Sequence, residues 1–203
     1  MSTGAPDTPG VARLDLRQAA RDAIRAEVRD RAMGLFAARG FEETTVDDIV
    51  GAVGISARSF FRYFPTKEDV ALGDGIRWGE QVVQALSEQP ADADPFRAMR
   101  GSMQFLVDGA IADPQRGLRD MRVIMSAPSL RARNVEKHLE WARMLLPEAE
   151  QRVGGDRKTR RLRARVLVHA SIACLDVAFA EWVASDGVAS LNDLLDVAFN
   201  ELR

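Results

Sequence analysis

Apolar side chains recur at helical spacing along most of the chain, and this pattern restricts the possible folds more than any other feature. The first repeat consists of Ile24, Val28, Ala32, Leu35 and Phe36. Offsets of 4, 8, 11 and 12 residues place these side chains on one face of a helix. Gly40 follows where a left-handed C-terminal cap is expected. No segment shows the alternation typical of a strand, so the sequence predicts an all-α protein.

Helix caps and proline or glycine breaks divide the chain into about nine expected helices. Their ranges are 24–39, 46–53, 57–63, 66–88, 96–111, 115–126, 129–153, 156–185 and 190–202. Residues 1–12 are rich in Gly, Pro, Ser and Thr, which predicts a disordered leader. We expect a first domain at 13–67 and a second, larger helical domain at 68–203.

The chain holds few of the residues that disulfides and metal sites need. Its single cysteine, Cys174, excludes an intrachain disulfide and suits a reducing, cytoplasmic setting. His138 and His169 are its only histidines, so we expect no metal and no cofactor. The sequence also lacks a Glu-x-x-His pair, a candidate Ser-His-Asp triad and a Gly-rich phosphate loop, which indicates that it is not an enzyme. With no uncharged apolar run of about 18 residues, we expect no membrane partner.

The expected helices at 46–53 and 57–63 are joined by a short turn that contains Gly54, which is the arrangement of a helix-turn-helix. In that motif the second helix enters the major groove, with its N-terminal residues at the base edges. Residues 54–67 contain three basic residues and no acidic one, although the surrounding domain is neutral. This local charge predicts a phosphate-binding surface. Charge alone leaves open a solvated basic face on an ordinary bundle.

Three stretches fix the positions of caps, turn, aromatic residues and a lysine together. They are 35–50 (LFAARGFEETTVDDIV), 54–56 (GIS) and 60–68 (FFRYFPTKE). In these positions the chain closely resembles the DNA-binding domain of TetR-family transcriptional regulators, over about residues 22–82, with the motif at about 45–64. The rest resembles the family only as a helical architecture. One departure is Phe61, where the family often has Tyr, although Tyr63 keeps a hydroxyl two residues later.

The resemblance and the helix-turn-helix geometry together suggest a role for each polar residue of the motif. Arg58 and Ser59 are expected at base edges, and Ala57 at a thymine methyl group. Residues expected to contact phosphates or to support the contact surface are Thr45, Ser56 (as the cap of the recognition helix), Arg62, Tyr63 and Lys67. The preceding Arg13, Arg17 and Arg21 are either an arm for the minor groove or a solvated helix face.

The helix expected at 156–185 is apolar on two sides, so we expect it to be buried on both. One side carries large residues: Val168, Ile172, Leu175, Phe179 and Trp182. The other carries Val166, Ala170, Ala173, Val177, Ala180 and Ala184, which would allow close approach of a partner helix. The last helix, with Phe199, would complete a four-helix homodimer interface. The pattern leaves open which side faces the partner.

Methionines recur at i, i+4 in the middle of the chain, together with large aromatic residues. These are Met99 and Met103, Met121 and Met125, with Trp141 and Phe179. Flexible thioethers suit an adaptable pocket, and the resemblance implies a small, often hydrophobic effector there, although an ordinary core would use the same residues. The basic run at 157–165 is expected to be a solvated helix start.

These observations predict a cytoplasmic, homodimeric transcriptional regulator. It would bind double-stranded operator DNA through residues 13–67 and an effector through residues 68–203. The main hypothesis is a repressor that a small molecule releases from a palindromic operator. The alternatives are a helical adaptor, a regulator that needs no effector and, remotely, a helical-bundle enzyme.

Overall fold

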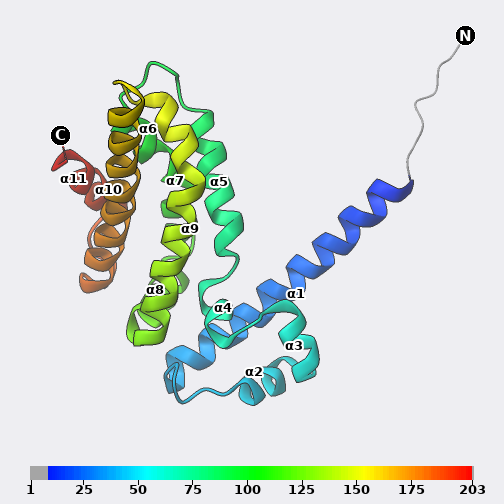
Figure 1. Cartoon of the computed structure of the whole chain (residues 1–203). Coiled ribbons are helices and arrows are strands. Elements are labelled where there is room, and N and C mark those ends of the chain that lie inside the picture. The colour runs from blue at the N-terminus through cyan, green and yellow to red at the C-terminus, as the bar shows by residue number, and fades with distance from the viewer. Residues whose placement is uncertain (1–8, 203) are drawn as a thin grey trace, which may run out of the picture. The chain divides into compact units, whose positions relative to one another are not determined.

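The computed structural model describes residues 9–202, and every regular element within that range is an α-helix (Figure 1). This confirms the expected all-α fold class. The helices are α1 (Pro9–Arg39), α2 (Val46–Val53), α3 (Ala57–Tyr63), α4 (Lys67–Leu72), α5 (Gly75–Ser87), α6 (Pro95–Ser102), α7 (Gln104–Ile111), α8 (Pro114–Ser126), α9 (Pro128–Arg152), α10 (Arg157–Ala184) and α11 (Leu191–Asn200).

The chain divides into two compact units, Met1–Val70 and Ala71–Arg203. Of the segment expected to be a disordered leader, residues 1–8 lie outside the described residues. Residues 9–12 already belong to α1. The first helix therefore begins well before residue 24, where the apolar repeat that predicted it starts.

The N-terminal unit is held together by a small core to which α1, α2 and α3 all contribute. Its fully or almost fully buried apolar side chains include Val28, Ala32, Met33, Phe36, Phe41, Ile49, Phe60 and Phe64. Gly40 ends α1 in the left-handed conformation, at φ +92°, and its N–H donates to the carbonyl of Phe36 at 2.9 Å. The buried Thr44 hydroxyl then donates to the Gly40 carbonyl at 2.7 Å. These bonds fix the turn that leads from α1 into α2.

Two of the expected helices are each interrupted once, so the described residues contain eleven helices. The expected helix at 66–88 is divided at Gly73, whose φ of +67° ends α4. Asp74 then caps α5 by accepting from the backbone N–H of Arg77 at 3.3 Å. The expected helix at 96–111 is interrupted at Met103, whose N–H donates to Arg100, only three residues earlier, at 3.3 Å.

The C-terminal unit is built around the neighbouring long helices α9 and α10, with α5, α6, α8 and α11 packed against them (Figure 1). Its core includes Leu86, Met99, Met103, Trp141, Leu145, Leu167, Val168, Leu175, Leu195 and Phe199. The indole Nε1 of Trp141 donates to the Gly75 carbonyl at 2.6 Å and so fixes the start of α5 on α9. Within this unit the Cys174 thiol is buried, and burial raises its pKa.

The described residues include one helix, α10, that is long and apolar enough to cross a membrane, judged by length and composition alone. Less than half of its most apolar stretch is buried within the unit. The large-residue side of α10 (Val168, Ile172, Leu175, Phe179 and Trp182) is buried. A core helix passes the same length and composition test, and α10 occupies the core of its unit.

Candidate nucleic-acid interface

The turn between α2 and α3 has the geometry of a helix-turn-helix. Gly54 caps α2 in the left-handed conformation at φ +76°, and its N–H donates to Val50 at 2.8 Å. Ser56 then caps α3, its Oγ accepting from the backbone N–H of Ser59 at 3.1 Å. Phe60 and Phe64 are buried and hold α3 against the unit. The opposite face of α3 is therefore directed to solvent.

The exposed face of α3 carries cations and one aromatic ring: Arg58, Phe61 and Arg62 are exposed, while Ala57, Ser59 and Tyr63 are half-buried. Arg58 has no hydrogen-bond or ion-pair partner among the described residues, which leaves its guanidinium available for a ligand. Arg62 lies over the Tyr63 ring, 5.0 Å from its centre, and donates to the Tyr63 hydroxyl at 3.3 Å. The Arg62 guanidinium and the Tyr63 hydroxyl therefore lie together and form one polar group, a cation beside a hydroxyl.

Thr45, at the start of α2, forms a capping box with Asp48. The Thr45 Oγ1 accepts from the Asp48 backbone N–H at 3.1 Å, and the Asp48 carboxylate accepts from the Thr45 backbone N–H at 2.9 Å. The Thr45 hydroxyl also donates to that carboxylate at 2.6 Å. The bonds from Thr45 hold the pKa of Asp48 below its usual range. The hydroxyl hydrogen that was expected at a phosphate is thus directed to Asp48 in this structure.

Lys67 differs most from its expected place. Its Nζ donates to the carbonyls of Phe41, at 2.7 Å, and Thr44, at 3.0 Å, and lies 4.2 Å from the centre of the Phe41 ring. Both carbonyls belong to the loop between α1 and α2. Because two acceptors and an aromatic face surround the ammonium, Lys67 holds this loop, and its phosphate contact stays a prediction.

Arg25 is a structural partner of the recognition helix that sequence reasoning missed. Its Nη1 donates to the backbone carbonyl of Tyr63 across 38 residues of sequence, and no local spacing signals such a contact. The proposed minor-groove arm is not extended here, since the backbone of 13–21 lies within α1. Of its arginines, Arg21 is exposed, and the side chains of Arg13 and Arg17 lie outside the described part.

The residues expected around an effector are gathered in the C-terminal core. Met99, Met103, Trp141 and Phe179 are buried members of one cluster, and the half-buried Met121 packs against it. Met125 is half-buried and is not among the residues that pack on this cluster. In this structure the thioethers of Met99 and Met103 fill part of the core. This is the ordinary core that the sequence left open as the alternative to a pocket.

The expected dimer residues fall into two groups. Val166 and Val177 are 57% and 55% exposed, Ala173 is also exposed, and Ala170 is half-buried. Phe199, which was expected in the dimer interface, is only 4% exposed and belongs to the core of its own unit. This corrects the expectation, because its ring already has apolar neighbours there.

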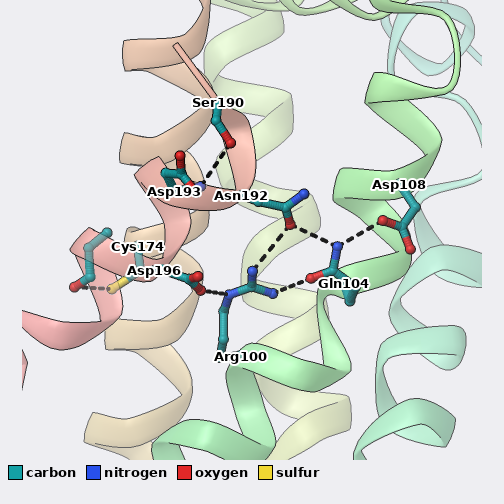
Figure 2. Close-up of polar contacts among 9 residues, drawn as sticks. Arg100, Gln104, Asp108, Cys174, Ser190, Asn192, Asp193 and Asp196 are labelled. Atoms are coloured by element: carbon teal, nitrogen blue, oxygen red, sulfur yellow. Dashed lines mark hydrogen bonds and ion pairs between the residues drawn. The ribbon is translucent and has the colours of Figure 1, made fainter.

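A polar network joins α11 to α6 and α7 (Figure 2). Arg100 donates from Nε to Asp196 at 2.7 Å, from Nη1 to Gln104 at 2.5 Å and from Nη2 to Asn192 at 3.3 Å. Gln104 in turn donates to Asn192 at 2.9 Å and to Asp108 at 2.8 Å. A groove of about 360 Å³ lies beside this network between α6 and α11. Because every nitrogen of the guanidinium is engaged, the network serves to fix α11 in place.

Comparison with known proteins agrees with the helix-turn-helix geometry. Residues 28–72 match the family model of bacterial regulatory proteins of the tetR family, and residues 93–203 match the model of the MftR C-terminal domain. The chain belongs to the TetR family and is a DNA-binding transcriptional regulator.

Relatives cover almost the whole chain. It is 31% identical to the HTH-type transcriptional regulator TcmR of Streptomyces glaucescens, over 98% of this chain and 88% of that protein. It is 28% identical to the putative mycofactocin biosynthesis transcriptional regulator MftR of Mycobacterium tuberculosis, over 85% and 86%. Among solved structures, the TetR-family repressor FadR of Thermus thermophilus in complex with lauroyl-CoA is 25% identical, with a TM-score of 0.53 over 88% of this chain and 92% of that one.

Proposed function

We propose that this protein is a homodimeric repressor that binds a palindromic operator through α3 and leaves it when a small molecule occupies the C-terminal unit. The observation that carries the DNA contact is the exposed face of α3. It presents Arg58, which has no partner in the described part of the chain, beside Arg62, and residues 54–67 include no acidic one. Arg58 reads a base edge, with guanine as its best bidentate partner. The Arg62 and Tyr63 pair contacts phosphates, which position the helix without reading sequence.

Dimerisation follows from the small size of α3. A helix of 7 residues offers few base contacts, so two copies on a two-fold site are needed for a specific operator, with half-sites about 34 Å apart. The exposed apolar positions Val166, Ala173 and Val177 on α10 supply the surface for the second copy. Single exposed apolar residues are ordinary, whereas several on one helix face favour an interface.

The effector is a small hydrophobic molecule that binds within the C-terminal unit. The methionines of its core can change rotamer at low cost and so open a space that they fill in the absence of the effector. An effector that binds the DNA-incompetent form more tightly shifts the population toward that form. The lauroyl-CoA in FadR supports an effector with a long apolar part. The function is regulatory rather than catalytic, and its place is the cytoplasm.

The experiment that tests this function is footprinting of the purified protein on DNA that flanks its own gene, followed by selection from random duplexes. We expect a protected near-palindrome and an affinity that falls steeply as salt rises. Arg58→Ala should lower the affinity by roughly tenfold or more, as the loss of a bidentate base contact does. Arg157→Ala, which removes an exposed arginine at the start of α10, is the matched control and should change nothing. Failure to bind any duplex at low salt would overturn the proposal.

A further inference from the structure

Phe61 is an exposed aromatic residue in the middle of the recognition helix. Its side chain is 51% exposed, whereas Phe60 and Phe64 on either side of it are buried. Its ring meets that of Phe60 edge-on, with the two ring centres 5.3 Å apart and the planes at 88°. One exposed ring alone would be ordinary, but this one stands on the face of α3 that the proposed function directs to DNA, so that bound DNA would cover it.

The residues beside Phe61 identify the chemistry of what covers it. Arg58, three positions earlier, and Arg62, the next residue, are both exposed. Residues 54–67 contain no acidic residue, so α3 and the residues on either side of it contribute only positive charge to this surface. An apolar protein surface would leave both guanidinium groups desolvated without partners, which is strongly unfavourable. The groove of a DNA duplex satisfies the cations and the ring together.

Within the major groove, a phenylalanine ring has one kind of apolar partner. It has no atom that can donate or accept a hydrogen bond, so it cannot bind phosphates or polar base edges as a tyrosine would. The C5-methyl group of thymine is the apolar group that bases display in this groove. The combined Arg62 and Tyr63 group already offers a hydroxyl and a cation for the backbone.

We infer that Phe61 contacts a thymine methyl group in each half-site and makes thymine the preferred base at one fixed position of the operator. This inference rests on the proposed function and adds the base that this residue selects. Phe61 is then a specificity-determining residue whose effect depends on a methyl group and not on charge.

Selection from random duplexes, carried out in parallel with the wild-type protein and with Phe61→Ala, tests the inference directly. We expect a fixed thymine in each wild-type half-site and loss of preference at that position alone in the variant. Ile76→Ala, which removes another exposed apolar side chain in the other unit, is the matched control and should select the wild-type site. Identical sites for the wild type and for Phe61→Ala would overturn the inference.

A second measurement needs no protein variant and so does not depend on its folding. In the selected duplex, that thymine is replaced by deoxyuridine, which lacks only the methyl group. We expect an affinity about fourfold lower for each half-site, the factor for one buried methyl group. Phe61→Tyr, which keeps the ring, should show the same methyl dependence.

The outcomes separate this inference from the function on which it rests. Wild-type binding that does not respond to deoxyuridine would overturn the role of Phe61 and leave the DNA-binding function intact. Absence of wild-type binding to any selected duplex would overturn the DNA-binding function, and the inference with it.

Discussion

Arg25 of α1 donates from Nη1 to the backbone carbonyl of Tyr63 at 2.6 Å, and its guanidinium lies 4.7 Å from the centre of the Phe64 ring. This one side chain fastens α1 to the C-terminal end of α3, where the last carbonyls have no partner within their own helix. The direction in which α3 presents Arg62 and Tyr63 therefore depends on a residue that is itself remote in sequence.

Replacing Arg25 with alanine should weaken both the fold of the N-terminal unit and its binding to DNA. A hydrogen bond from a charged group contributes about 1.5–3 kcal/mol, and the free energy of unfolding in urea should fall by roughly that amount. Operator affinity should fall as well, because α3 loses its fixed direction. Arg21→Ala, an exposed change on the same helix, should leave stability unchanged. If Arg21→Ala lowered operator affinity instead, the minor-groove arm would regain support.

Lys67→Met separates the role seen in the structure from the role expected from the sequence. Methionine keeps the apolar stem but leaves the carbonyls of Phe41 and Thr44 without their donor, so we expect a loss of about 2 kcal/mol in the free energy of unfolding. The slope of log affinity against log salt should not change. A slope reduced by about 0.9 for each half-site, with unaltered stability, would instead identify Lys67 as a phosphate contact.

The sequence predicted the local features of the N-terminal unit because they depend on neighbouring residues. Caps such as Ser56 and the left-handed Gly40 are set by the chain within a few residues. The contact made by Lys67 depends on residues 23 and 26 positions away, and such pairs leave no periodic signal. The expected position of its charge at the helix start was correct, but its partners were not predictable.

In the C-terminal unit, the sequence predicted that α10 is apolar on two sides but not which of the two sides its own unit covers. Phe199 shares a face with Leu195 on α11, and both are buried in their own unit, although periodicity alone allowed them to face a partner. The sequence did not predict the interruption at Gly73, because the helical pattern around it is otherwise continuous. The positive φ of Gly73 and the cap at Asp74 end one helix and begin the next in spite of that pattern.

Gly79 should not tolerate a side chain, because α5 approaches α9 closely at this residue. A Cβ atom at Gly79 would lie 2.6 Å from Cδ1 and 2.9 Å from Nε1 of Trp141, whose buried indole is fixed by its bond to Gly75. Gly79→Ala should therefore lower the free energy of unfolding by about 1–3 kcal/mol. Gly109→Ala on α7 has open space around its Cβ and should raise it by about 1 kcal/mol, since alanine is the better helix former. Equal effects of the two changes would contradict the close packing of α5 on α9.

The capping box of α2 should make stability depend on pH in the acid range. The pKa of Asp48 is lowered in the folded protein by its bonds from Thr45, so the charged carboxylate stabilises the fold. This contribution is present above the unfolded pKa, about 4, and is lost as pH falls through the lower folded value. Asp48→Asn should therefore be less stable than the wild type at pH 7, and the difference should shrink as pH falls below the unfolded pKa. Urea unfolding across this range measures it, and a difference that did not change with pH would contradict the assignment.

The exposed face of α10 provides the most direct test of the proposed dimer. Val177 is 55% exposed on a helix whose opposite side is buried, so a charge at this position should not disturb the fold of the unit. In a dimer the same position would be desolvated, and an unpaired carboxylate there is strongly unfavourable. Val177→Glu should therefore convert a dimer into a folded monomer in sedimentation and weaken operator binding, because each half-site then binds alone. Val188→Glu changes an exposed valine in the loop before α11 and should leave the dimer intact. A Val177→Glu protein that sediments as a dimer would move the interface to another face of the molecule.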